Sequence, residues 1–165
     1  EKSRLFLKGH SYSNDNIDRI LHEFAVNKID ASQLVFEGQC SREDLLKGYG
    51  EVDIALDPFP YPGGTTTCEA LWMGVPTITM KGNSFLSSVG ETIAVNSGHY
   101  DLCAENAGKY IELAVQLSGD IATLNSNRLK RRSNIIKTPL FDGLCFAKDF
   151  ERLLEVMIEK VPSNA

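Results

Sequence analysis

The sequence predicts an α/β domain in which helices cover both faces of a parallel sheet. Short apolar runs bounded by turn residues recur along the first 80 residues, and segments of helical periodicity separate them. Strands that alternate with helices in this way are joined by right-handed crossovers, which leave neighbouring strands parallel. Strands are expected at Arg4–Leu7, Leu34–Phe36, Asp53–Leu56 and Thr77–Thr79.

The predicted helices carry an apolar stripe or a recognisable start signal. The first places Ile17, Ile20, Leu21 and Phe24 at i, i+3, i+4 and i+7, with charged residues between them, so it buries one face. The other helices are expected at about Arg42–Tyr49, Thr65–Met73, Ser84–Ala94, Tyr110–Leu117, Ile121–Arg132 and Phe146–Val161.

The composition is that of one ordinary globular domain spanning residues 1–165. The 17 Lys and Arg against 22 Asp and Glu give a net charge of −5, which argues against a nucleic-acid partner. No apolar run approaches the roughly 18 residues of a membrane span. No charged-then-apolar run follows Glu1, so we do not expect secretion, and we expect the chain to be a fragment of a longer one. The four cysteines form no CxxC pair, so we expect free thiols, no metal site and a cytoplasmic protein.

One loop stands out as a candidate ligand site. Asp57–Gly64 (DPFPYPGG) follows a predicted strand and holds three prolines and two glycines, and ligands of open parallel sheets bind beyond the carboxyl ends of the strands. Gly63 and Gly64 allow a close backbone approach. The next three residues, Thr65–Thr67, offer hydroxyls and unpaired amides at a helix N-terminus, which favour phosphate.

Glu69 lies one turn further along this predicted helix, on the side of Thr65 and Thr66, where its carboxylate could accept hydrogen bonds from ribose hydroxyls. Together these residues predict a site for a nucleotide diphosphate. The alternative is that the threonines only cap the helix and the glycines only turn the chain. Asp57 would repel phosphate, so we expect it to brace the loop instead.

The remaining polar and aromatic candidates have simpler interpretations. No role is assigned to His10, His22 or His99, and Trp72 is expected to pack in the core. The basic residues are expected to form a solvated helix face; they are Arg128, Lys130, Arg131 and Arg132.

The run from Leu56 to Met80 (LDPFPYPGGTTTCEALWMGVPTITM) resembles the signature of the O-linked GlcNAc transferase family, which includes the SPINDLY-like proteins, and resembles the bacterial members most. Further similar stretches lie at Lys2–Lys8, Ile29–Gly38, Ser41–Asp57 and Thr138–Gly143. The resemblance implies the C-terminal half of a GT-B glycosyltransferase. Such enzymes have two Rossmann-like domains that hold a UDP-sugar in the cleft between them, usually after tetratricopeptide repeats.

The resemblance also implies donor contacts. Thr65 and Thr66 match the family's diphosphate-binding threonines, and Glu69 matches the acidic position that holds the ribose. Arg42 matches a basic residue at the uracil edge, and Cys40 matches a position that contacts uracil through its backbone.

Two positions depart from the family pattern. Leu45 stands where many members have a histidine that stacks on the uracil, so the base would rest on an aliphatic side chain. Pro62 stands where bacterial members commonly have asparagine, which changes the hydrogen bonding of the loop.

The function implied by the resemblance is inverting transfer of a sugar, with GlcNAc favoured over glucose or fucose, from a UDP-sugar to Ser or Thr hydroxyls of a protein acceptor. No metal or other cofactor is expected. The family's diphosphate lysine and its N-terminal-domain histidines match nothing in this chain, so we assign it no catalytic residue and expect no turnover without the upstream domain and repeats. The alternative is a non-catalytic nucleotide-binding or protein-interaction module that keeps the fold.

The last predicted helix is expected to bury the stripe formed by Phe146, Phe150, Leu153 and Met157. In complete GT-B enzymes the last helix often crosses to the N-terminal domain. The alternatives to burial are therefore a displaced helix or one that pairs with a neighbouring chain, and an exposed Phe150 in a monomer would support displacement.

Overall fold

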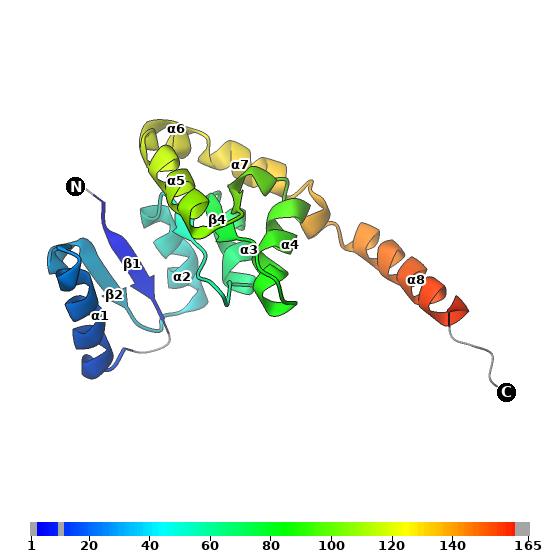
Figure 1. The fold of residues 1–165 in the computed structure, drawn as a ribbon. Helices are drawn as coiled ribbons and strands as arrows, with labels where there is room; N and C mark the ends of the chain where they lie inside the picture. Colours follow the sequence, from blue (N-terminus) through cyan, green and yellow to red (C-terminus); the bar gives the residue numbers. More distant parts are fainter. Residues whose placement is uncertain (1–2, 10–11, 161–165) are drawn as a thin grey trace. The chain divides into compact units, whose positions relative to one another are not determined.

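A computed structural model describes residues 3–9 and 12–160 of the chain. The chain divides into two compact units, Glu1–Gly48 and Tyr49–Ala165. Strands in both units pair in parallel (Figure 1), which confirms the predicted α/β class.

The first unit is a strand–helix–strand crossover followed by a short helix. Strands β1 (Leu5–Lys8) and β2 (Leu34–Glu37) pair in parallel, and α1 (Asn14–Val26) connects them. The 3-10 turn η1 (Ala31–Gln33) leads into β2, and α2 (Arg42–Gly48) follows it.

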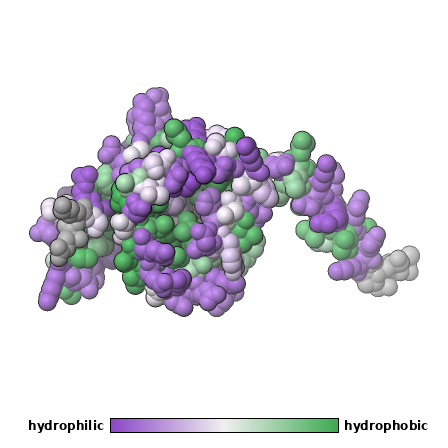
Figure 2. Space-filling model, turned by 90° about the horizontal axis from the view of Figure 1, so that it is seen from above, coloured by the Kyte–Doolittle hydropathy of each residue, from purple (hydrophilic) through white to green (hydrophobic). Residues whose placement is uncertain are grey.

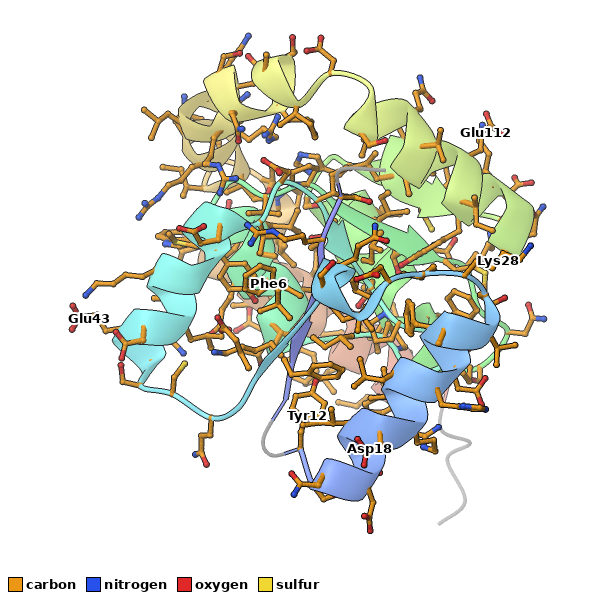
Figure 3. All side chains as sticks on the ribbon, turned by 90° about the vertical axis from the view of Figure 1, so that its left-hand side faces the viewer. Phe6, Tyr12, Asp18, Lys28, Glu43 and Glu112 are labelled. Atoms are coloured by element: carbon orange, nitrogen blue, oxygen red, sulfur yellow. The ribbon has the colours of Figure 1, made fainter. Side chains whose placement is uncertain are left out.

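The apolar stripe predicted for the first helix is half-buried in α1, which confirms its amphipathic character. Charged side chains occupy the outer surfaces of the unit, as Asp18 on α1 and Glu43 on α2 illustrate (Figure 3). Tyr12 meets the ring of Phe36 edge-on, with ring centroids 5.4 Å apart. This contact ties the chain segment before α1 to β2.

The second unit contains a three-stranded parallel sheet in the order β3-β4-β5. Its strands are β3 (Ala55–Leu56), β4 (Thr77–Met80) and β5 (Cys103–Ala104). Its α-helices are α3 (Thr65–Trp72), α4 (Val89–Asn96), α5 (Ala107–Ser118), α6 (Ile121–Ser126), α7 (Arg128–Ile135) and α8 (Gly143–Glu159). Its 3-10 turns are η2 (Tyr49–Glu51), η3 (Leu86–Ser88), η4 (Tyr100–Leu102) and η5 (Pro139–Phe141).

The core of the second unit has two apolar clusters. Ile78 of β4, Ala104 of β5 and Leu113 of α5 form one of them, and the half-buried Tyr110, Ala114 and Leu117 of α5 pack against it. Leu71 and Ile93, from α3 and α4, form the other together with Ile135 of α7. Because side chains alternate along a strand, Ile78 and Thr79 of β4 point to opposite faces of this sheet. Ile78 packs against α5 and Thr79 lies beside Gly90 of α4, so helices cover both faces.

All four predicted strands are present, but β3 is Ala55–Leu56, half of the predicted Asp53–Leu56. Two further differences concern the sheets. The strands form two hydrogen-bonded sheets, one in each unit, instead of one. Strand β5 was not predicted, because Cys103–Ala104 pairs through only two residues and has no apolar run of its own. The predicted basic helix is also interrupted, since α6 ends before Asn127 and α7 begins after it.

The prediction of a solvated basic face is wrong for two of its arginines. Arg128 donates to the carbonyl oxygens of Tyr49 (2.7 Å) and Val52 (2.6 Å). Arg131 donates to the carbonyl oxygens of Gly74 and Leu124. These guanidinium groups satisfy carbonyls where helices and loops end, which a charge run in a sequence does not reveal.

Trp72 is half-buried, and its ring lies 5.2 Å from that of Phe141, so the predicted packing role is confirmed. The Arg132 guanidinium lies over the indole, 5.7 Å from the ring centroid. Cation–π contact therefore adds to the packing of this aromatic pair.

The burial predicted for the last helix is wrong. No described residue of α8 is buried, and Phe146 and Phe150 are 68% and 49% exposed. Figure 2 shows apolar side chains among polar ones on the helix that precedes the grey C-terminal residues. The periodicity sets which face is apolar, but no described part of the chain covers that face; Val161, at the predicted end of the helix, lies outside the described residues.

No helix within residues 3–9 and 12–160 combines the length and the apolar character needed to cross a membrane.

Candidate functional site

The loop after β3 leads directly into the N-terminus of α3, as the sequence predicts. The N-cap residue of α3 is Gly64, which has no side chain to accept a hydrogen bond from the first-turn amides. The first-turn amides of a helix have no carbonyl partner within the helix, and the helix dipole adds positive potential there. Thr65 and Thr66 are exposed at this turn, so their hydroxyls lie at the surface beside those amides.

The buried carboxylate of Asp57 holds the loop in place through hydrogen bonds. Its side chain is only 3% exposed, and Oδ1 accepts hydrogen bonds from the Gly63 amide (2.6 Å) and the Thr67 hydroxyl (3.2 Å). Oδ2 accepts from the Thr79 hydroxyl of β4 (2.9 Å). Burial raises the pKa of the Asp57 carboxyl, and these three hydrogen bonds oppose that effect. The predicted bracing role of Asp57 is confirmed.

Two glycines make this arrangement possible. A Cβ at Gly63 would lie 2.5 Å from Thr67 Oγ1 and 2.8 Å from Thr66 Oγ1, so a larger residue would displace both hydroxyls. A Cβ at Gly90 of α4 would overlap Thr79 Oγ1 and lie 2.7 Å from Asp57 Oδ2. Gly64 differs, because a Cβ there would meet no atom within 4 Å. Space beside Gly64 is therefore open.

Two tyrosines hold the ends of the loop. The Tyr110 hydroxyl of α5 donates to the Asp57 carbonyl oxygen (2.9 Å), and its ring meets that of Phe59 edge-on at 5.4 Å. The Tyr49 hydroxyl donates to the Thr66 carbonyl oxygen (2.9 Å). Burial raises the pKa of each phenol to about 12, so both tyrosines are neutral donors at physiological pH. The negative charge of Glu69 also raises the pKa of Tyr49, and that of Asp57 raises the pKa of Tyr110.

The residues predicted to bind phosphate and ribose lie close together in the structure. Gly63 and Gly64 end the loop, and Thr65, Thr66, Thr67 and Glu69 lie in the first one and a half turns of α3. Thr67 differs from its two neighbours, because it is buried and its hydroxyl donates to Asp57. Its backbone amide remains the group that it would offer to a ligand. Glu69 is 8% exposed and lies one turn further along α3.

The three predicted uracil contacts belong to the first unit and follow its second strand. Cys40 is exposed in the segment after β2, Arg42 is exposed at the start of α2, and Leu45 is half-buried within α2. The Ser41 hydroxyl accepts from the Asp44 amide (3.1 Å), which caps the start of α2.

Sequence reasoning missed four residues that hold this loop: Tyr49, Thr79, Gly90 and Tyr110. For Thr79 a signal exists, since the strand VPTITM alternates apolar residues with threonines and so points hydroxyls to one face. The tyrosines and Gly90 reach the loop only through the tertiary fold.

In the part of the chain that the structure describes, no group of three or more His, Cys, Asp or Glu side chains could hold a metal ion. The His99 ring contacts the Ser97 hydroxyl at 3.2 Å, and His22 is exposed on α1. His10 lies outside the described residues.

A parallel α/β unit with an open helix N-terminus at the carboxyl end of a strand is typical of nucleotide-binding domains. Comparison with known proteins shows to which family within this class the chain belongs. The chain belongs to glycosyl transferase family 41, whose family model matches residues 5–150, and the resemblance seen in the sequence is thereby confirmed.

Relatives in plants and animals match most of the chain. A Petunia hybrida protein described as "Probable UDP-N-acetylglucosamine--peptide N-acetylglucosaminyltransferase SPINDLY" is 36% identical over 155 residues, which cover 90% of this chain and 16% of that protein. The Caenorhabditis elegans UDP-N-acetylglucosamine--peptide N-acetylglucosaminyltransferase is 29% identical over 164 residues, which cover 99% of this chain and 14% of that protein. The chain thus spans less than a fifth of each of these relatives.

Among solved structures, a mutant of the Thermobaculum terrenum O-GlcNAc transferase matches with a TM-score of 0.84 and 28% sequence identity. The match covers 93% of this chain and 30% of that one. The predicted GT-B fold class is therefore confirmed.

Proposed function

We propose that this chain is the donor-binding part of an inverting glycosyltransferase that transfers GlcNAc from a UDP-sugar to Ser or Thr hydroxyls of a protein. The observation that carries the proposal is the exposed N-terminal turn of α3, where two threonine hydroxyls lie beside unpaired amides. Membership of glycosyl transferase family 41 and the names of the relatives support the donor and the peptide acceptor.

In this proposal Thr65, Thr66 and the α3 amides hold the diphosphate, and Glu69 accepts hydrogen bonds from the ribose. For Cys40, Arg42 and Leu45 a role at the uracil is supported by the family resemblance. Gly63 and Gly64 shape the turn, and the open space beside Gly64 supports a close approach of the ligand to the backbone there.

The chemical contribution of this chain is to stabilise the leaving group. As the acceptor oxygen bonds to the anomeric carbon from the opposite face, the bond from that carbon to the UDP oxygen breaks and negative charge grows on the diphosphate. Amides and hydroxyls already aimed at that charge lower the barrier without reorganising. We propose no metal cofactor, and no residue of this chain is proposed as the base that takes the acceptor's proton.

The complete activity requires partners beyond this chain. We propose an upstream GT-B domain that supplies the other wall of the donor site, and tetratricopeptide repeats that present the protein acceptor. We also propose a cytoplasmic location; the four cysteines are free thiols in the structure, which agrees with a reducing compartment.

A transfer assay tests the proposal. The complete protein that carries this chain is given UDP-GlcNAc, UDP-glucose or GDP-fucose together with a protein acceptor, and sugar on Ser or Thr is measured by mass spectrometry. We expect transfer from UDP-GlcNAc above the other two donors. Binding of UDP without transfer from any donor would instead identify a non-catalytic nucleotide-binding module.

A further inference from the structure

Asp57 is a buried carboxylate whose hydrogen-bond donors are all neutral. The three donors are the Gly63 amide and the hydroxyls of Thr67 and Thr79, at 2.6, 3.2 and 2.9 Å. Burying a carboxylate against neutral donors costs more than burying an amide or an apolar side chain of the same size. A carboxylate does, however, accept through two oxygens with several lone pairs, which no other side chain of this length can do.

The two oxygens of Asp57 hold different elements. Oδ2 is fixed to β4 through Thr79, while Oδ1 bridges Gly63, in the loop, and Thr67, in the first turn of α3. The carboxylate therefore joins the sheet, the end of the loop and the start of the helix through one rigid group.

These three hydrogen bonds of Asp57, which we call the bracket, lie on the buried side of the turn, whereas Thr65 and Thr66 are exposed. The bracket holds Gly63 against the hydroxyls of Thr66 and Thr67, so closely that a Cβ would not fit, while Thr65, Thr66 and the space beside Gly64 stay open. The inner contacts of the turn thus fix where its outer hydroxyls and amides point.

We propose that Asp57 is a positioning residue for phosphate binding, which sets the geometry of the α3 N-terminal turn without touching the ligand. This inference rests on the proposed function, because it assumes that the turn binds the diphosphate of a nucleotide. The inference goes further than the proposed function, because it states that the hydrogen bonds of Asp57, and not its charge, position the phosphate-binding hydroxyls and amides.

The test compares UDP with uridine in the complete protein by calorimetry. Asp57→Ala removes the bracket, so we expect UDP affinity to fall about tenfold or more, with uridine affinity changed less than about threefold. Asp57→Asn keeps one carbonyl oxygen for Gly63 and Thr67, so we expect UDP affinity within about threefold of the natural protein.

Ser97→Ala is the matched control, because Ser97 is equally buried but its hydroxyl bonds to other groups, the Ala94 carbonyl oxygen and the His99 ring, instead of the Asp57 carboxylate. We expect it to lower thermal stability and leave UDP affinity unchanged. If Asp57→Ala does not fold, Thr67→Val removes one of the two Oδ1 donors and should weaken UDP, but not uridine, about threefold or more.

Equal losses for UDP and uridine would overturn the inference, since they would indicate a general structural role. Tighter UDP binding by Asp57→Asn, by about tenfold, would also overturn it, because Asp57 would then act through its charge. A natural protein that binds no UDP would instead refute the proposed function on which the inference rests.

Discussion

Helices α3 and α8 both carry clear sequence signals, yet their surroundings differ completely. Four of the eight residues of α3 are buried, and its first turn is hydrogen-bonded to Asp57 through the Thr67 hydroxyl and to Tyr49 through the Thr66 carbonyl oxygen. Helix α8 is capped by Asp142, whose side chain accepts from the Cys145 amide, but none of its described residues is buried. A helical pattern therefore predicts an apolar face, whereas only the tertiary fold supplies the surface that covers it.

The largest expected effect separates the core of the second unit from α8. Leu113→Ala removes a buried side chain from the cluster with Ile78 and Ala104, so it should lower the free energy of unfolding by about 3 kcal/mol. Phe150→Ala, on the exposed face of α8, should change it by less than about 0.5 kcal/mol in this 165-residue chain. Chemical denaturation of both variants measures the difference. A large loss for Phe150→Ala would show that the face of α8 is covered within the chain.

An intermediate effect comes from two glycines. Gly90→Ala forces a Cβ against Thr79 and Asp57, so we expect a loss of about 2 kcal/mol in the free energy of unfolding. Gly143→Ala, at the start of α8, meets no atom within 4 Å and should be neutral or stabilise by up to about 1 kcal/mol. Thermal and denaturant unfolding of the two variants provide the measurement. Equal effects at both glycines would contradict the tight packing described around Asp57.

A smaller effect is expected at the rim of the loop. Tyr110→Phe removes only the hydroxyl that donates to the Asp57 carbonyl oxygen and keeps the ring against Phe59, so the loss should be about 1 kcal/mol. Tyr100→Phe, whose side chain is exposed, is the control and should have almost no effect on unfolding. If the two variants were equally stable, the hydroxyl of Tyr110 would not hold the loop.

The sequence predicted those features that depend on local pattern. Four strands, the stripes of α1 and α5, and the position of the turn at Thr65 all follow from periodicity and from the Pro and Gly of the loop. The bracing role of Asp57 followed from simple electrostatics, because its carboxylate would repel the phosphate that the sequence predicts beside it.

Other features required distant parts of the chain to meet. Gly90 is separated from Asp57 by more than thirty positions, and only the packing of α4 on the sheet shows why it cannot carry a side chain. In the sequence alone, Arg128 and Arg131 are part of a run of basic residues that indicates a solvent-exposed face. Only the folded structure shows that they donate to the carbonyl oxygens of Tyr49 and Gly74. The exposure of α8 could not be predicted from its own sequence, because its apolar stripe is the same whether or not a partner covers it.

The central claim is that the open turn of α3 binds the diphosphate and ribose of UDP. Calorimetric titration of UDP into the complete protein tests it most directly, with Thr66→Ala and Glu69→Ala as the variants and the exposed Thr92→Ala of α4 as the control. Each hydrogen bond to a charged group contributes about 1.5–3 kcal/mol, so both variants should weaken UDP about tenfold or more, and the control should not. UDP affinity unchanged by both Thr66→Ala and Glu69→Ala would contradict the site, even with the fold intact.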